Sequence, residues 1–307
     1  EYGSKAVGLK PGANVRVWLP IPPTNQHQSV SVKAAKFPAK ATTARESQYG
    51  NCMVYFETVA PSNGEVSFSM VFDVTRAEVK ALGRDGKTLS KVERRIFLKP
   101  NRLVPTTGRP LDLLKGINAP GDQLDLGRFL YERVDTHMKY DKSRPGYGTG
   151  DSVWACDSQF GNCTDFHSLF ISLARAKGLP ARFEIGFPIP ESRGKGTIGG
   201  YHCWAFFHTD KHDWVPTDIS EADKQRGYEM VETLKKNQAK MSHFMGFVGV
   251  FSDHLAKSIR NKKRATQVNV WKCWDTVANA FTDIKEELEI TIDEDDYELT
   301  VKMDTID

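Results

Sequence analysis

The first hundred residues follow the two-residue period of β-strands. Three runs are rich in β-branched and aromatic residues and are separated by turn-forming stretches: residues 15–22, 51–59 and 65–79. In the third run Val66, Phe68, Met70 and Phe72 share one face, as expected of a strand with one buried side. The pattern predicts an N-terminal all-β sandwich domain over residues 1–98.

The middle of the chain changes to helical spacing and then returns to strands. Residues 98–112 carry three prolines and predict a linker, whereas residues 122–140 place apolar side chains three and four positions apart and predict a helix. After a glycine-rich loop, a second helix is predicted from residue 162, followed by three strand-like stretches: residues 181–190, 201–208 and 213–220. Helices followed by strands predict an α+β core over residues 99–225.

The chain changes again near residue 227. Apolar residues at helical spacing between Val231 and Ile259 predict one or two amphipathic helices. Residues 288–303 alternate on both sides of an acidic turn and predict a β-hairpin. The sequence therefore predicts a C-terminal extension over residues 226–307, to which it assigns no role.

Composition narrows the class of protein. The chain has 307 residues, of which 39% are hydrophobic and 26% are charged, as in ordinary globular proteins. A net charge of +3 is too small to indicate a nucleic-acid partner. No apolar run approaches the length of about 20 residues that a membrane span needs, so we expect no span. The oligomeric state is not predicted.

Cys163 stands at the start of its predicted helix, where a packing cysteine would gain nothing. Asn162 is a preferred N-cap residue, Asp165 places a negative charge in the first turn, and Gly178 with Pro180 ends the helix. The free backbone N–H groups and the positive end of the helix dipole stabilise a thiolate and can bind a developing oxyanion. The position predicts a nucleophile.

The strand-like stretches after this helix can supply a base and an orienting carboxylate. Residues 201–208 and 213–220 predict a hairpin joined by the polar stretch TDKHD. If His208 pairs with Trp214, His202 and Asp218 become diagonal neighbours on one face, among aromatic residues. The chain then offers nucleophile, base and carboxylate in the order Cys163, His202, Asp218.

Two other arrangements compete with this one. His167 lies four residues along the helix from Cys163, but its place beside the apolar stripe favours a hydrogen-bonded core histidine. A metal site could use Cys156, Cys163, His167 and Cys203. The first two are seven residues apart, wider than the usual spacing of zinc ligands, so we expect no metal. Five cysteines leave at least one free thiol, and the sequence does not decide whether Cys156 forms a disulfide.

Four short motifs resemble those of the transglutaminase-like superfamily, which has a papain-like fold: GNC at 161–163, GLPAR at 178–182, YHCW at 201–204 and WVPTD at 214–218. The resemblance implies a nucleophile helix packed on an antiparallel sheet. It also implies Cys163 as nucleophile, His202 as general base and acid, and Asp218 as the orienting residue.

The details of the resemblance extend the prediction. An upstream aromatic residue or glutamine usually supplies a second oxyanion donor in this family, and Tyr131, Trp154 and Gln159 are the candidates. Trp204 is a candidate for the substrate groove. WLPIP near the N-terminus and DISEADK after Asp218 are most similar to bacterial secreted transglutaminase-like proteins, which implies a secreted or periplasmic location. A chain that begins at Glu1 fits a removed signal peptide, and equally a trimmed chain.

The implied activity is thiol-dependent acyl transfer on peptide or protein amide bonds, without a cofactor. Hydrolysis by a peptidase or amidase is favoured; the alternatives are a protein-glutamine transglutaminase or deamidase, and a non-catalytic binding protein that keeps the fold. The acidic stretch DEDD at 293–296 lacks the spacing of a calcium loop. The motifs identify the nucleophile but not the substrate.

Overall fold

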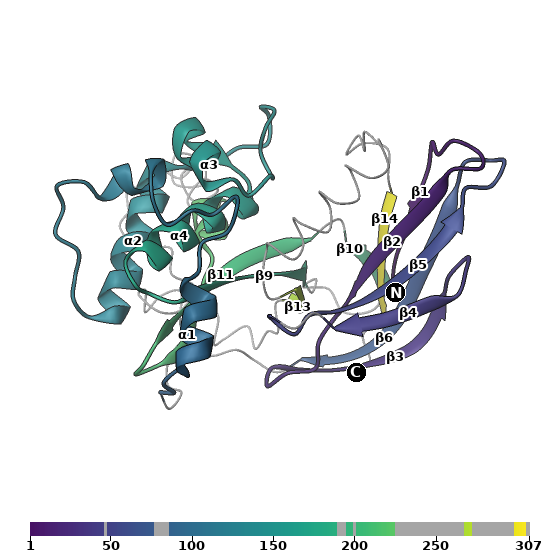
Figure 1. The fold of residues 1–307 in the computed structure, drawn as a ribbon, viewed down its shortest axis with the longest axis horizontal. Coiled ribbons are helices and arrows are strands. Elements are labelled where there is room, and N and C mark those ends of the chain that lie inside the picture. The colour runs from purple at the N-terminus through teal and green to yellow at the C-terminus, as the bar shows by residue number, and fades with distance from the viewer. Residues whose placement is uncertain are drawn as a thin grey trace, which may run out of the picture. The chain divides into compact units, whose positions relative to one another are not determined.

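The computed structural model describes residues 1–45, 48–76, 86–188, 195–198, 201–224, 267–271 and 298–304. The chain forms two compact units (Figure 1). Each is assembled from segments that are not adjacent in sequence. The first contains Glu1–Glu78, Ile185–His202 and Ala265–Asp307, and the second contains Val79–Glu184 and Cys203–Arg264.

The first unit consists of β-strands: β1 (Tyr2–Ala6), β2 (Asn14–Ile21), β3 (Gln28–Lys36), β4 (Ala41–Arg45), β5 (Cys52–Val59), β6 (Val66–Arg76), β10 (Lys195–Ile198) and β14 (Glu298–Asp304). They form a five-stranded sheet in the order β10-β14-β1-β6-β3 and a three-stranded sheet in the order β2-β5-β4. The strand pairs within both sheets are antiparallel.

The two sheets of this unit share a hydrophobic core. Val15 and Phe56 of the smaller sheet pack with Val66 of the larger one. The rings of Phe56 and Phe68 meet edge to face, with 5.5 Å between their centroids. The β-sandwich predicted for the N-terminal region is therefore present, and the three predicted strands are confirmed as β2, β5 and β6. The sequence did not predict β1, β3 and β4.

The second unit is mixed. Its helices are α1 (Lys91–Leu98), the 3-10 helix η1 (Arg109–Leu114), α2 (Gln123–His137), α3 (Ser152–Ser158) and α4 (Cys163–Ala176). Its short parallel pair is β7 (Lys139–Tyr140) with β8 (Phe160–Gly161). A four-stranded sheet runs in the order β12-β11-β9-β13: β9 is Ala181–Pro188, β11 is His202–Thr209, β12 is Asp213–Thr217 and β13 is Gln267–Trp271. Of this sheet, β13 and the end of β9 from Ile185 fall within the residue ranges of the first unit. Residues 219–224 are helical.

Helix α4 is the centre of the second unit. All of its residues from Cys163 to Arg175 are buried. Helices α1, α2 and α3 each contact it, and Figure 1 shows α2, α3 and α4 gathered together. Phe170 of α4 packs on Phe207 of β11, with ring centroids 6.1 Å apart. A nucleophile helix packed on an antiparallel sheet is the predicted papain-like arrangement.

Most elements predicted for the core are confirmed. The helix expected over residues 122–140 is α2, with Asp122 as its N-cap. The hairpin of β11 and β12 has the predicted register, with His208 opposite Trp214. Helices α1 and α3 were not predicted, and part of the expected linker is the helix η1.

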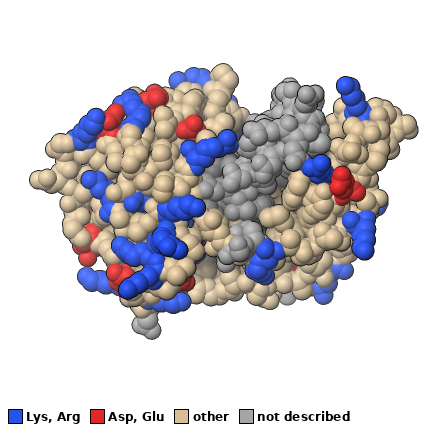
Figure 2. Space-filling model, in the orientation of Figure 1, with Lys and Arg blue, Asp and Glu red and all other residues tan. Residues whose placement is uncertain are grey.

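The predicted C-terminal extension lies largely outside the described residues. Its amphipathic helices and the first arm of its hairpin fall there. The second arm coincides with β14, which pairs with β1 and β10. Within the described part of the chain, no helix is long and apolar enough to cross a membrane. Figure 2 shows Lys and Arg side chains interspersed with Asp and Glu, in keeping with the small net charge of +3.

Candidate active site

The N-terminus of α4 is capped as its sequence predicts. Asn162 is the N-cap, and its side chain accepts a hydrogen bond from the backbone N–H of Thr164 at 2.8 Å. The Asp165 carboxylate accepts the N–H of Asn162 at 2.9 Å and completes a capping box. Cys163 is the first residue of the helix and is 5% exposed. Its thiol therefore lies where the helix dipole favours a thiolate.

The Asp165 carboxylate also ties the glycine-rich loop to this helix end. It accepts the N–H of Gly148 at 2.7 Å and that of Gly150 at 3.2 Å. A Cβ added to Gly161 would lie 2.5 Å from Asp165 Oδ2, so a glycine is required just before the N-cap. Asp165 thus positions both the loop and the strand that lead to Cys163.

Burial perturbs this carboxyl group. Desolvation raises the pKa of Asp165 from 3.8 to about 6, although the three backbone N–H groups act in the opposite direction. A thiolate at Cys163 raises it further by charge repulsion. The helix end therefore combines a dipole that favours the thiolate with a neighbouring carboxylate that opposes it when ionised.

This raised pKa predicts a measurable dependence of stability on pH. Between pH 3.8 and about 6 the folded chain holds a proton on Asp165 that the unfolded chain has released. The group's stabilising contribution is therefore complete below pH 3.8 and is lost as the pH rises through 6. We expect the free energy of unfolding of the wild type, minus that of Asp165→Asn, to fall by about 3 kcal/mol across this window. Urea titrations of both proteins at several pH values measure it, and a difference that stays constant or rises would contradict the assignment.

Strand β11 places a second thiol beside the nucleophile candidate. The Sγ of Cys203 lies 3.7 Å from the Oγ1 of Thr164, the residue that follows Cys163, and the Cys203 thiol is near enough to Cys163 to interact with it electrostatically. Cys203 has no exposed surface. Burial, and then the neighbouring Cys163, raises the pKa of the Cys203 thiol well above its ordinary value. Of the two thiols, Cys203 is thus held in its neutral form.

Asp218 lies at the same end of α4, but for a different reason from the one predicted. Alternation would place it on the Trp204 face only if β12 continued, and β12 ends at Thr217. Asp218 Oδ1 instead accepts the N–H of Glu221 at 3.0 Å and the hydroxyl of Ser220 at 3.1 Å, as an N-cap does for residues 219–224. The end of the strand turns this carboxylate toward α4.

His167 connects α4 to this capped turn. Its Nε2 accepts the N–H of Ile219 at 3.0 Å and lies 3.7 Å from Asp218 Oδ1. Since Nε2 accepts a backbone hydrogen bond, the ring is neutral with its proton on Nδ1. His167 is completely buried, so its prediction as a hydrogen-bonded core histidine is confirmed. This hydrogen bond fixes Ile219, the residue that follows Asp218, against α4.

The other predicted site residues lie on identified elements. His202 is the half-buried first residue of β11 and directly precedes Cys203. Trp204 is 9% exposed and packs in a cluster with Leu89, Phe206 and Trp214. This cluster is on the face of β11 opposite to Cys203, because side chains alternate along a strand. The groove assignment of Trp204 stays a prediction.

The three oxyanion candidates also stay predictions. Tyr131 is buried in α2. Trp154 of α3 packs edge to face on Phe160, with ring centroids 5.2 Å apart. Gln159 is the C-cap of α3 and adopts a positive φ of 59°.

Two residues that the sequence did not indicate, Tyr140 and Lys224, contribute to the surroundings of Cys163. Tyr140 pairs with Gly161 across the parallel strands β7 and β8, two residues before Cys163. Lys224 Nζ lies over the Tyr140 ring, 4.3 Å from its centre. Burial raises the pKa of Tyr140, and the thiolate forms of Cys163 and Cys203 raise it further. This phenol is therefore a protonated donor in the electrostatic field of Cys163.

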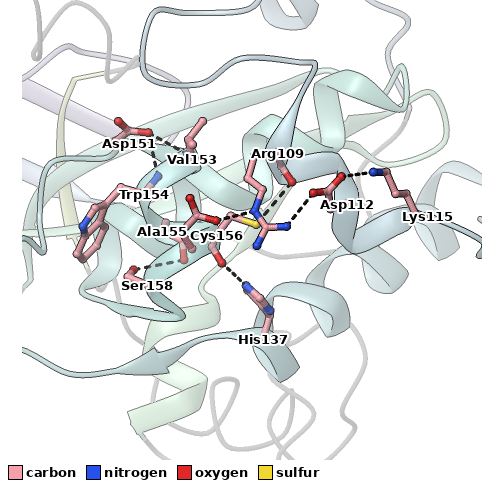
Figure 3. A network of polar contacts seen from close by, with 11 residues as sticks. Arg109, Asp112, Lys115, His137, Asp151, Val153, Trp154, Ala155, Cys156 and Ser158 are labelled. Atoms are coloured by element: carbon pink, nitrogen blue, oxygen red, sulfur yellow. Dashed lines mark hydrogen bonds and ion pairs between the residues drawn. The ribbon is translucent and has the colours of Figure 1, made fainter.

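A polar network joins helix α3 to η1 and α2 (Figure 3). Arg109 contacts Asp112 at 2.7 Å and Asp157 at 2.5 Å. The Cys156 thiol lies 3.7 Å from the carbonyl oxygen of Arg109, and the carbonyl oxygen of Cys156 lies 2.7 Å from His137 Nε2. Cys156 is a free, buried thiol, as are Cys163 and Cys203. In the described ranges, no three His, Cys, Asp or Glu side chains gather as metal ligands.

Comparison with known proteins agrees with this geometry. Residues 112–219 match the model of the transglutaminase-like superfamily, so this part of the chain is a transglutaminase-like domain. An uncharacterised protein of Haemophilus influenzae is 31% identical over 128 residues, which are 36% of this chain and 35% of that protein. The match therefore spans about a third of that relative's length.

Two solved structures align with this chain at low sequence identity. A candidate cysteine protease from Cytophaga hutchinsonii aligns with a TM-score of 0.50 and 15% identity, over 71% of this chain and 75% of that one. The periplasmic domain of TgpA from Pseudomonas aeruginosa aligns with a TM-score of 0.33 and 17% identity, over 70% and 76%. The transglutaminase-like domain and its fold support a cysteine-dependent enzyme.

Proposed function

We propose that this protein is an acyl-transfer enzyme in which Cys163 attacks a peptide or protein amide, His202 is the general base and acid, and Asp218 is the orienting residue. The proposed reaction is hydrolysis, by a peptidase or amidase. The observation that carries the proposal is Cys163 as the first residue of a capped, buried helix, with the residue after Asp218 hydrogen-bonded to His167 of the same helix.

The surroundings of Cys163 fit the first chemical step. The thiolate adds to the amide carbonyl, and His202 protonates the departing amine. The carbonyl oxygen becomes an oxyanion, for which the backbone N–H of Cys163 at the start of α4 is the proposed donor. Water, activated by the same histidine, then releases the acid from the thioester.

Tyr140 fits the side-chain half of the oxyanion site. Its strand partner Gly161 directly precedes the N-cap of α4, so the phenol projects from the backbone next to the nucleophile. Burial raises the pKa of Tyr140, so the phenol keeps its proton and can donate it to an oxyanion. We therefore favour Tyr140 over Tyr131, Trp154 and Gln159.

The Tyr140→Phe variant tests this assignment. Loss of one oxyanion donor should lower kcat by about 100-fold with KM nearly unchanged, because the hydrogen bond strengthens only in the transition state. Tyr147→Phe is the matched control, since Tyr147 also lies under a lysine, with Lys142 Nζ 5.5 Å from its ring centre. Steady-state kinetics on all three proteins would exclude Tyr140 if both variants kept wild-type kcat.

One experiment separates the reaction outcomes. The protein is incubated with a glutamine-containing peptide, with and without an added primary amine, and the products are identified by mass spectrometry. Chain cleavage would support a peptidase. Conversion of glutamine to glutamate would support a deamidase or amidase, and incorporation of the amine would support a transglutaminase. A panel of peptides with none of these products, and equal iodoacetamide labelling rates across the thiols, would contradict an enzyme and favour a non-catalytic binding protein.

A further inference from the structure

The proposed acyl transfer leaves one buried thiol at the site unused. Cys203 belongs to β11 and has no exposed surface, and its Sγ lies 3.7 Å from the side chain of Thr164, the residue next to Cys163. A small apolar residue would fill the same space without a second sulfur. Packing alone therefore does not explain why a second thiol lies at this position.

The two thiols are held together by rigid elements. Cys163 is fixed by the capping box of α4, and Thr164 Oγ1 lies 3.7 Å from the Cys203 sulfur. Further along β11, Phe207 packs on Phe170 of α4. Helix α2 packs closely against the same strand, because a Cβ on Gly127 would lie only 2.4 Å from the Phe207 ring. A disulfide of about 2 Å between the two sulfurs would therefore form across the contact between α4 and β11.

We propose that Cys163 and Cys203 form a dithiol that a peroxide converts to a disulfide, with Cys203 as the resolving thiol. The Cys163 thiolate attacks a peroxide oxygen, the O–O bond breaks, and Cys163 becomes a sulfenic acid while hydroxide or an alkoxide leaves. The Cys203 sulfur then displaces hydroxide from the sulfenic sulfur. The Cys203 proton converts the departing hydroxide to water, so two thiols are oxidised and one peroxide is reduced.

The order of the two steps follows from the surroundings of each thiol. Cys163 lies at the helix end that favours a thiolate and retains some exposure, whereas Cys203 is neutral and enclosed. Peroxide therefore reacts first at Cys163. The neighbouring thiol captures the sulfenic acid before further oxidation to sulfinic acid, which is irreversible for most proteins. The disulfide preserves the nucleophile in a form that a reductant restores.

The test uses the whole chain and needs no substrate. The wild type is treated with hydrogen peroxide, alkylated, digested and analysed by mass spectrometry, before and after dithiothreitol. We expect a cross-linked peptide pair containing Cys163 and Cys203, and nearly complete recovery of both thiols. In Cys203→Ala, Cys163 should pass to sulfinic acid, with less than about a tenth recovered by dithiothreitol. Cys156→Ala, which removes a buried thiol outside the pair, should behave as the wild type.

A second probe does not depend on oxidation. Phenylarsine oxide condenses with two adjacent thiols and releases water. It should therefore bind the wild type and Cys156→Ala. The bound arsenical should resist displacement by a monothiol and be released by a dithiol. Binding should be lost in Cys203→Ala and in Cys203→Ser. Sulfinic acid at Cys163 of the wild type without a cross-link, or equal retention of the arsenical by the Cys203 variants, would overturn the proposal. Both experiments measure the mass of the protein or of its peptides and need no turnover. Their outcome is therefore independent of whether the acyl-transfer proposal is correct.

Discussion

Replacing Cys163 with alanine should reduce turnover of the amide substrate by about 10,000-fold or more. The variant keeps the N-cap and the capping box, which use Asn162 and Asp165 rather than the thiol. It removes the atom that would form the thioester, and loss of a nucleophile from a catalytic triad has effects of this size. The measurement is product formation with the peptide identified by mass spectrometry.

Cys156→Ala is the matched control for this variant. Cys156 is also a buried free thiol on a helix, but burial raises its pKa and its sulfur faces the carbonyl oxygen of Arg109. We expect its turnover to stay within about twofold of the wild type, since the change lies away from the proposed chemistry. Iodoacetamide at neutral pH should label Cys163 much faster than Cys156. Unchanged turnover in Cys163→Ala would reject the nucleophile.

The sequence predicts the nucleophile helix because its signals are local. Asn162, Asp165 and Gly178 act within one turn of a helix end, and the structure uses Asn162 and Asp165 as caps and gives Gly178 a positive φ of 76°. The register of β11 with β12 is also local, because a short polar turn fixes how the two strands meet. The same kind of signal was available for α1, since Ser90 and Glu93 form a capping box at its start.

The contacts between distant segments were not predictable in this way. Tyr140 reaches the nucleophile through a two-residue parallel strand pair, which is too short to leave a pattern in the sequence. The proximity of Cys203 to Cys163 depends on how β11 packs on α4. Asp218 illustrates the limit most clearly. The prediction from side-chain alternation required β12 to continue through Asp218, but the strand ends at Thr217 and a helix begins. The position of Asp218 follows instead from the hydrogen bond between the backbone N–H of Ile219 and His167.

Asp218→Asn should lower turnover by about 1,000- to 10,000-fold while leaving the fold nearly intact. Asparagine caps a helix as well as aspartate does, so the free energy of unfolding should change by less than about 1 kcal/mol. Catalysis should still fail, because an amide cannot hold the histidine tautomer or stabilise the imidazolium as a carboxylate does. Turnover and urea unfolding, measured on the same preparation, separate the two roles.

Asp122→Asn provides the comparison that isolates the catalytic role. Asp122 caps α2 by accepting the N–H groups of Leu124 and Asp125, as Asp218 caps residues 219–224, but it has no place in the proposed chemistry. We expect both variants to unfold like the wild type, with turnover lost only in Asp218→Asn. If Asp218→Asn kept turnover within about tenfold of the wild type, the carboxylate would be a helix cap alone, because a triad carboxylate contributes far more than that. His202 would then need a different orienting group.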